Sequence, residues 1–297
     1  MNIYKDNFLL NTGIITLIFA SVSYLLLNSI NEDIFSNFTK NQIVISFFQF
    51  LFSALIVAPI FEEIIFRSFF LKSKRKYFLK IQFYLGISIY IFITENYYLY
   101  SLLFFIFLLD YLNRNKIIIY ILNTFVFALI HYNLDDFSSF FSIIPVFFQI
   151  GVGFILIWIV INFNLFISIL FHFLYNFVMI SLMILSLQKP TFNEYKVLEN
   201  ELIYLKWKEI PFFNNQNNFV TLSDNLIQIE NVEASKIFEI LEIDKSKYYF
   251  NKISPFQKIS LEIRLNNKNQ RKINYGEIPK FLLEVELIKE KDKNNAD

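Results

Sequence analysis

The chain has no cysteine among its 297 residues. This absence excludes disulfide bonds, thiolate metal sites and a cysteine nucleophile together. Charged residues are scarce at 18%, where a soluble domain carries about a quarter. Their signs nearly cancel to a formal net charge of +1, so no basic surface for nucleic acid is expected. A chain this poor in charge is expected to place much of its length in an apolar phase.

Apolar residues are abundant, at 55% of the chain, and they occur in long runs. A run of about 17–25 such residues can cross the roughly 30 Å hydrocarbon core of a bilayer. Two shorter runs, Ile81–Ile93 and Tyr97–Leu112, form a hairpin that either spans the membrane or re-enters on the same side. The pattern therefore predicts an all-α polytopic membrane bundle of about seven transmembrane helices. The five strong candidate spans are Phe8–Ile30, Ile43–Leu71, Ile117–Tyr132, Phe140–Phe163 and Leu165–Leu187.

A basic loop predicts the orientation of this bundle. Five basic residues follow the second run: Lys72, Lys74, Arg75, Lys76 and Lys80. Cytoplasmic loops carry an excess of lysine and arginine, so we place this loop and the N-terminus inside. The alternation then puts Arg114 and Lys116 inside as well. The acidic residues Glu32, Asp33, Glu95, Asp135 and Asp136 fall outside. We expect an integral protein of the cytoplasmic (inner) membrane.

The composition changes after Pro190, and most of the charged residues lie beyond it. Lys258–Leu265 alternates apolar and polar residues, and Leu283–Leu287 alternates in the same way, which is typical of strands. Ser235–Leu241 has helical spacing. We predict a transmembrane domain over residues 1–189 and a small soluble α+β domain over residues 190–297. This second domain contains no chemical motif.

Three ionisable residues interrupt the second apolar run: Glu62, Glu63 and Arg67. Each such residue inside a membrane costs about 3 kcal/mol and is a functional-site hypothesis by default. Glu63 and Arg67 are four residues apart and share a helical face in the favourable order for an ion pair. Glu62 is turned about 100° away, which leaves its carboxylate free. The alternative is a helix end at the membrane surface with Arg67 extended toward water, which leaves both carboxylates unexplained.

Both histidines of the chain, His131 and His172, lie in apolar runs. A single buried histidine is more often a hydrogen-bonded residue of the core than a catalytic group, so each histidine alone is weak evidence for a functional site. The absence of any histidine from the polar segments favours a site. The helical rise puts both histidines and Glu62 about 12–22 Å from the cytoplasmic loops, which is compatible with one site near the middle of the membrane.

Three short motifs occur in order along these runs. EExxxR is read at Glu62–Arg67, FxxxH at Phe127–His131 and HxxxN at His172–Asn176. In this combination the chain resembles the CAAX-protease and bacteriocin-processing family of membrane peptidases, with a motif core over residues 42–187. It departs from the family at Ser68, where a glycine often follows the motif arginine. The segment between the first two motifs is also longer than is usual, because the hairpin is inserted there.

The resemblance implies an intramembrane endopeptidase similar to the type II CAAX prenyl endopeptidases. In the family, the first glutamate and the FxxxH histidine activate a water molecule, and these map onto Glu62 and His131. The HxxxN pair stabilises the oxyanion of the reaction, and it maps onto His172 and Asn176. The implied substrate is a membrane-associated peptide or protein, either a prenylated CAAX protein or a pheromone or bacteriocin precursor.

The resemblance also implies that Glu63 and Arg67 hold the catalytic helix. Members of the family have been described as metallopeptidases too, and Glu62, His131 and His172 would make a three-ligand zinc site with an open fourth position. We favour the metal-free interpretation, with no cofactor, because the HxxxN pair has no obvious task beside a zinc ion.

Two other classes of function are weighed against the protease. One is a non-catalytic relative that acts as a scaffold or confers immunity to a bacteriocin-like peptide, for which a broken motif is expected. The other is an ion-coupled transporter, since carboxylates and histidines in spans also form proton relays. Transporters commonly show repeated halves with Gly- or Pro-interrupted helices, and this chain has 5 glycines and no visible repeat. The expected partners are the lipid bilayer and the substrate, with no nucleic acid.

Overall fold

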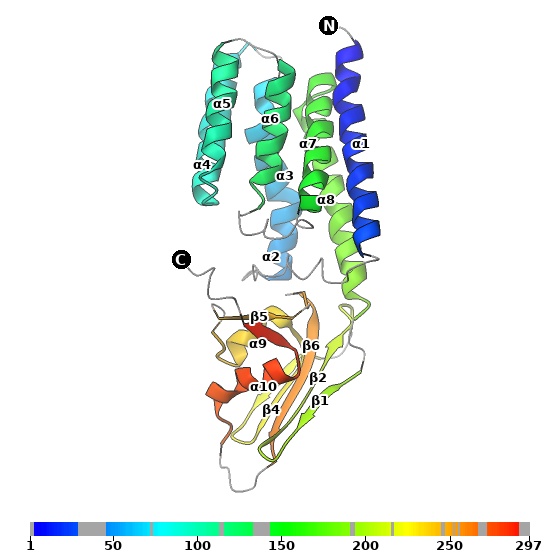
Figure 1. The fold of residues 1–297 in the computed structure, drawn as a ribbon, viewed down its shortest axis with the longest axis vertical. Coiled ribbons are helices and arrows are strands. Elements are labelled where there is room, and N and C mark those ends of the chain that lie inside the picture. The colour runs from blue at the N-terminus through cyan, green and yellow to red at the C-terminus, as the bar shows by residue number, and fades with distance from the viewer. Residues whose placement is uncertain are drawn as a thin grey trace. The chain divides into compact units, whose positions relative to one another are not determined.

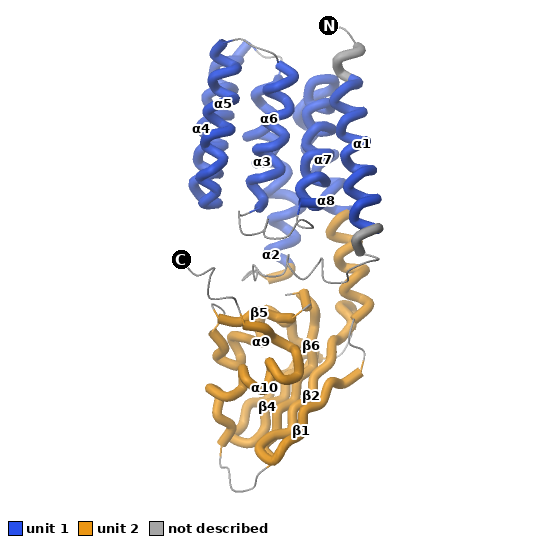
Figure 2. The backbone as a smooth tube through the Cα atoms, in the orientation of Figure 1, with its two compact units in different colours: residues 1–34, 48–178 blue, residues 35–47, 179–297 orange. Residues whose placement is uncertain are grey.

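The computed structural model describes residues 3–28, 46–71, 74–112, 116–132, 143–190, 194–214, 217–244, 247–251, 253–254, 256–266 and 272–290. The chain divides into two compact units (Figure 2). The first comprises residues 1–34 and 48–178, and the second comprises residues 35–47 and 179–297. The division after residue 178 falls inside a helix, whereas the sequence prediction put the boundary after that helix, at Pro190.

The first unit is built of helices (Figure 1). Their bounds are α1 Ile3–Asn28, α2 Phe47–Phe52, the π-helical turn η2 Ser53–Val57, α3 Ala58–Arg67, the 3-10 turn η3 Ser68–Phe70, α4 Lys76–Ile93, α5 Leu99–Tyr111, α6 Lys116–Leu129, α7 Ile143–Asn162 and α8 Leu165–Leu187. The segment from α2 to η3 is one interrupted helical run. The last part of α8 belongs to the second unit.

Helix α1 packs closely on α7 through two glycines. A Cβ atom on Gly13 would lie 2.9 Å from the backbone oxygen of Gly151, and one on Gly151 would lie 2.7 Å from Leu17 Cγ. Small residues let membrane helices approach to backbone contact, which increases the van der Waals attraction between them. These two of the five glycines therefore fix the position of the N-terminal helix.

Within the described residues, five helical segments are long and apolar enough to cross a membrane: Asn7–Leu25, Phe47–Phe70, Lys76–Ile93, Ile143–Asn162 and Leu165–Leu187. The sequence analysis differs in two places. The predicted span Ile117–Tyr132 forms α6, which has 14 residues and is about 21 Å long. The first arm of the predicted hairpin is longer than expected, because α4 has 18 residues. The unit is thus a mostly helical membrane bundle, and the total of about seven crossings stays a prediction.

The predicted hairpin consists of α4 and α5, joined by a turn in which Glu95 has a φ of 58°. Lys80 Nζ lies 2.7 and 2.6 Å from the two carboxylate oxygens of Asp110, so an ion pair ties the two arms together. A Cβ atom on Gly86 would lie 3.2 Å from Ile65, which places α4 directly against α3. The hairpin therefore packs against the helix that carries the first motif.

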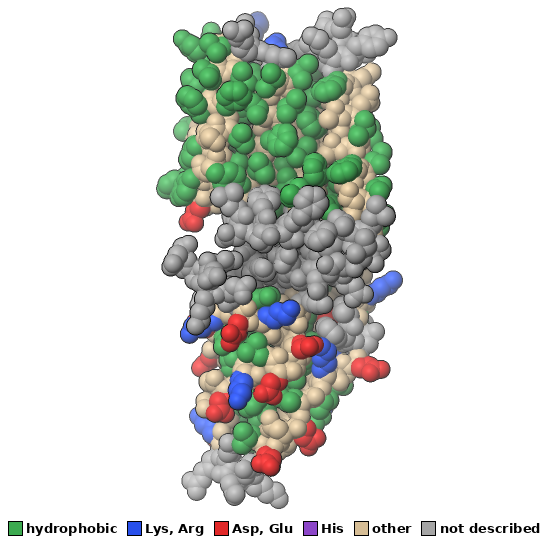
Figure 3. Space-filling view, viewed as in Figure 1, with side chains coloured by type: hydrophobic (Ala, Val, Ile, Leu, Met, Phe, Trp, Pro, Cys, Tyr) green, Lys and Arg blue, Asp and Glu red, His purple; other side chains and the backbone are tan. Residues whose placement is uncertain are grey.

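Side chains on the surface of the helical unit are largely apolar. Phe48, Ile81 and Phe104 are 81%, 64% and 66% exposed. On the face seen in Figure 3, hydrophobic side chains cover the helices, and charged side chains gather on the second unit. An apolar surface of this extent needs an apolar surrounding, which a bilayer supplies. The protein is an integral membrane protein. The predicted loop residues Glu32, Asp33, Lys72, Arg114, Asp135 and Asp136 lie outside the described residues.

The second unit contains a five-stranded antiparallel sheet in the order β1-β2-β6-β4-β3. The strands are β1 Lys196–Glu199, β2 Ile203–Ile210, β3 Phe219–Leu222, β4 Leu226–Glu233 and β6 Lys258–Leu265. A separate pair joins β5 Tyr248–Phe250 to β7 Ile288–Glu290. The helices are α9 Ala234–Ile240, the 3-10 turn η6 Tyr275–Glu277 and α10 Ile278–Glu284. The core holds Trp207, Phe238 and Leu282, each at most 1% exposed.

The predicted α+β character of this unit is confirmed, with one error in detail. Strand β6 has the predicted bounds, and α9 overlaps the predicted helix almost completely. The strand predicted over Leu283–Leu287 is wrong, because the chain there ends α10 and turns. Pro279 lies in the first turn of α10, where proline favours a helix start, and Ile278, Phe281 and Leu282 are buried with helical spacing.

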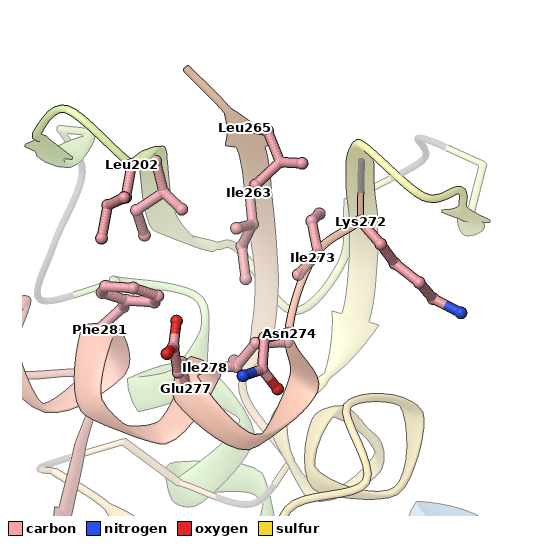
Figure 4. Close-up of a pocket in the computed structure, with 10 residues that line it drawn as sticks. Leu202, Ile263, Leu265, Lys272, Ile273, Asn274, Glu277, Ile278 and Phe281 are labelled. Carbon is pink, nitrogen blue, oxygen red and sulfur yellow. The ribbon is translucent and has the colours of Figure 1, made fainter. Parts of the chain in front are cut away.

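A small hollow lies between the end of β6 and α10 (Figure 4). Its lining is apolar apart from Lys272, Asn274 and Glu277. The Asn274 side chain accepts a hydrogen bond from the backbone N–H of Gly276, and Lys272 extends away from the hollow in the figure. It therefore lacks a converging set of polar groups, and the candidate site is sought in the helical unit.

Candidate active site

The first motif lies on α3, which starts with Ala58 and Pro59 directly after the π-helical turn. Glu62, Glu63 and Arg67 are 7%, 0% and 0% exposed. A charge buried in an apolar environment is retained only when it is paired or hydrogen-bonded. The partners of these three groups therefore define the site.

Glu62 faces both histidines of the chain. Its Oε1 lies 3.5 Å from Nε2 of His131, and its Oε2 lies 3.8 Å from Nε2 of His172. The three side chains come from α3, from the turn after α6 and from α8. The structure thus brings together three of the four residues predicted to be catalytic, around one carboxylate.

The sequence analysis had placed His131 on a helix, but the structure does not. Helix α6 ends at Leu129, and His131 occupies the turn that follows. Its Nδ1 is 2.8 Å from the backbone oxygen of Phe127. Because a carbonyl oxygen only accepts, Nδ1 carries the proton, and Nε2 is the atom presented to Glu62. The imidazole is 27% exposed, more than the side chains of Glu62 at 9% and His172 at 5%, so this is the accessible side of the carboxylate.

Glu63 is held mainly by α8. Ser168 Oγ donates to its Oε2 at 2.5 Å, and Nδ1 of His172 lies 3.2 Å from its Oε1. The predicted partner Arg67 is farther, with Nε at 4.0 Å from Oε1. Glu63 therefore orients the ring of His172 and turns its Nε2 toward Glu62, because a carboxylate bound to one ring nitrogen of a histidine fixes the direction of the other.

Arg67 is held by α6. Its Nη1 donates to Oδ1 of Asn123 at 2.9 Å, and Asn123 Nδ2 donates to the backbone oxygen of Phe66 at 3.2 Å. The guanidinium also lies 4.4 Å from the ring centroid of Phe127, a cation–π contact. The Phe127 ring meets both histidine rings edge-on, at centroid distances of 5.3 Å and 6.0 Å. The phenylalanine of the second motif is thus the packing centre of the site.

The sequence analysis missed Asn123 and Ser168, both of which are fully buried. Each precedes a motif residue by four positions, Phe127 and His172 respectively. A polar residue one turn before a motif residue, on the same face of an apolar helix, is the signal that would have identified them.

Asn176 lies one turn beyond His172 on α8. Its Nδ2 donates to the backbone oxygen of Ala54 in the π-helical turn at 2.8 Å. Among the described contacts, none joins Asn176 directly to Glu62. It borders the site from the end where η2 leads into α3.

Comparison with protein families identifies the segment that carries these residues. Residues 44–178 match the family described as type II CAAX prenyl endopeptidase, Rce1-like. The helical unit carries an Rce1-like domain. The match contains all three motifs and ends just beyond Asn176, while all strands of the second unit lie outside it. At the level of the family it supports a CAAX-type intramembrane protease. Comparisons with curated proteins and with solved structures gave no match.

The Rce1-like site has the donor types of a zinc site in Glu62, His131 and His172. As these side chains stand, however, no three His, Asp or Glu residues in the described part of the chain form a group that could hold a metal ion. The metal-free interpretation stays a prediction, and metal analysis is part of the test below.

Proposed function

We propose that this protein is an endopeptidase of the cytoplasmic membrane that cleaves a membrane-associated peptide or protein by metal-free hydrolysis. One observation carries the proposal: the Glu62 carboxylate lies between the Nε2 atoms of two histidines, each oriented through its Nδ1. Such an arrangement holds a base and its partners in fixed geometry in an apolar site, where electrostatic interactions are strong.

In the proposed reaction, a water molecule lies beside Glu62 and Nε2 of His131, on the exposed side of the imidazole, and contacts both groups. His131 accepts one hydrogen bond from the water, and Glu62 removes a proton as the water oxygen attacks the peptide carbonyl carbon. The carbonyl oxygen becomes an oxyanion. When the C–N bond breaks, Glu62 returns the proton to the leaving amine, so that water is consumed and Glu62 is regenerated.

His172 and Asn176 stabilise the oxyanion in this proposal. His172 acts as an imidazolium, with Nδ1–H on Glu63 and Nε2–H on the oxyanion. The four charged groups in the resting site, Glu62, Glu63, Arg67 and His172, then sum to zero, which suits a region of low dielectric constant. Asn176 contributes the N–H that its contact with Ala54 leaves over.

The direct test is a cleavage assay of the purified protein on membrane-tethered peptides, including a prenylated C-terminus and hydrophobic precursors. We expect cleavage that survives chelation, with Glu62→Gln as the inactive control. A scaffold or immunity protein would leave every peptide intact. An ion-coupled transporter would instead show proton-dependent uptake in proteoliposomes.

Metal content separates the two hydrolytic mechanisms. We expect elemental analysis of active protein to show well below one zinc per chain. One zinc per chain, with full inactivation by a chelator and recovery on adding zinc back, would refute the metal-free mechanism and assign Glu62, His131 and His172 as ligands.

A further inference from the structure

The backbone oxygen of Ala54 lacks a donor from its own helix. In the π-helical turn Ser53–Val57, hydrogen bonds run from residue i+5, and the N–H of Ala58 donates to the oxygen of Ser53. The next bond in this register would come from residue 59 to Ala54. Residue 59 is proline, which has no N–H.

The α-helical register cannot supply the donor either. There, the oxygen of Ala54 would accept from Ala58, whose N–H is already bonded to Ser53. A backbone carbonyl left without a donor inside a membrane costs free energy. The side chain of Asn176 supplies the donor, with Nδ2 at 2.8 Å.

This contact fixes the Asn176 carboxamide. The Ala54 oxygen only accepts, so the nitrogen of Asn176 and not its oxygen faces the π-helical turn. A carboxamide is planar, so anchoring one N–H sets the direction of the second N–H and of the oxygen. Without the anchor, the carboxamide can rotate about its terminal torsion, which is broad.

We infer that Pro59 is a positioning residue for Asn176: by withholding an N–H from the π-helical turn, it reserves the Ala54 carbonyl to orient the Asn176 side chain. Pro59 is buried at the start of α3, one turn before Glu62 and Glu63. The same interruption of the helix thus orients a donor on α8 while it starts the helix that bears the carboxylates.

The effect on catalysis rests on the proposed function. Pro59→Ala restores an N–H, and either that N–H or the one of Ala58 in a repaired α-helical register takes the Ala54 oxygen. The Asn176 carboxamide is then released. We expect kcat to fall by about 10-fold, with KM changed by less than about threefold, because the lost orientation matters in the transition state.

A matched variant separates the two effects of Pro59→Ala, the gain of a backbone N–H and the loss of the proline ring. Lactic acid installed at position 59 by nonsense suppression removes the proline ring as alanine does, but places an ester oxygen where alanine has N–H. We expect this variant to keep kcat within about threefold of wild type. Pro145→Ala, in the first turn of α7, controls for loss of a helix-starting proline elsewhere.

The deciding measurement does not require activity. Asn176→Ala should lower the melting temperature of the full chain by about 3 °C, because it leaves the Ala54 oxygen without a hydrogen-bond donor. In the Pro59→Ala background, the same substitution should lower it by less than half as much. In the lactic acid and Pro145→Ala backgrounds, the drop should equal that in wild type.

If Asn176→Ala lowered the melting temperature equally in wild type and in the Pro59→Ala, lactic acid and Pro145→Ala backgrounds, the inference would be overturned. This holds whether or not the protein cleaves peptides. Coupling between Pro59 and Asn176 in a protein that cleaves no peptide would leave the inference standing and overturn the proposed function. Full activity of Pro59→Ala despite thermal coupling would remove Pro59 from catalysis and overturn the positioning role.

Discussion

The two units of this chain treat polar and apolar side chains in opposite ways. In the helical unit, Glu63 and Arg67 are fully buried, and Phe48 is 81% exposed. In the sheet unit, Trp207 is fully buried, and the side chains of the pair Lys272–Asp224 are 71% and 73% exposed. Each unit follows the medium that surrounds it, bilayer or water, and Figure 3 shows the two kinds of surface.

The comparison separates charged side chains that only keep a surface soluble from buried charged side chains that need another explanation. Exposed ion pairs on the sheet are worth about 0–1 kcal/mol and need no further explanation. The charges inside the helical unit are costly, and among the described residues Glu62, Glu63 and Arg67 converge with both histidines on one cluster, apart from the Lys80–Asp110 pair of the hairpin. Substitutions of equal chemistry should therefore have unequal consequences in the two units.

The largest effect is expected at Glu62. Glu62→Gln keeps the shape of the side chain but removes the base, so kcat should fall by about 10⁴-fold, equivalent to about 5.5 kcal/mol. The melting temperature should change little, because Glu62 is not the residue that holds α8. Cleavage at more than about a tenth of the wild-type rate would remove Glu62 from the mechanism.

The second largest effect is expected in the core of the sheet unit. Trp207→Ala should destabilise this unit by about 3–5 kcal/mol, because a fully buried indole is replaced by a cavity. The isolated segment Thr191–Asp297, followed by circular dichroism, should unfold cooperatively and lose that transition in the variant. Cleavage by the full chain should stay within about twofold. A segment that never unfolds cooperatively would contradict an independent domain.

Substitution of Glu63 should destabilise the helical unit by somewhat less than Trp207→Ala destabilises the sheet unit. Glu63→Gln leaves Arg67 as a buried cation without a carboxylate, which we expect to cost about 3 kcal/mol. Ser168→Ala is the control, since it removes a hydrogen bond to Glu63 but no charge, and should cost about 1 kcal/mol. Equal melting temperatures for Glu63→Gln and wild type would show that Asn123 alone holds Arg67.

The oxyanion donors come next. Asn176→Ala and His172→Ala should each lower kcat by about 10²-fold, the loss typical of one such donor, with little change in KM. Steady-state kinetics on one peptide substrate provide the measurement. A rise in KM at constant kcat would instead place these residues in substrate binding.

The smallest effect is expected on the sheet surface. A hydrogen bond from Lys206 to Glu262 on the neighbouring strand raises the pKa of Lys206 above its usual value. The pair therefore stabilises the folded state below the ordinary lysine pKa and loses this contribution as pH rises through the raised value. Glu262→Gln should cost about 0.5 kcal/mol at neutral pH, measured by chemical unfolding of the isolated segment.

Much of this architecture could be predicted from residue spacing. The helical spacing separated Glu62 from Glu63, because a helix turns about 100° per residue. In the structure, Glu62 faces the histidines, and the carboxylate of Glu63 accepts a hydrogen bond from Ser168 of α8. Strand β6 followed from its strict alternation. These features depend on local geometry, which the sequence carries directly.

Long-range partners could not be predicted in the same way. Nothing in the sequence indicated that Arg67 would donate to Asn123, 56 residues away, and not chiefly pair with Glu63. The length of α6 was overestimated because hydropathy does not mark where a helix gives way to a turn inside an apolar run. The alternation over Leu283–Leu287 misled because buried positions after α10 happen to be spaced by two.

The contact between Gly13 on α1 and Gly151 on α7 has a consequence for biosynthesis. Helix α1 leaves the ribosome before α7, and the contacting glycine of α7 is encoded 138 residues after that of α1. At about 5–20 residues per second, α1 spends roughly 7–28 s in the membrane without that partner. During this interval its glycine face is open to lipid and to the helices of other nascent chains. Docking of α1 is thus timed by the synthesis of α7, shortly before the HxxxN helix α8 emerges and completes the site.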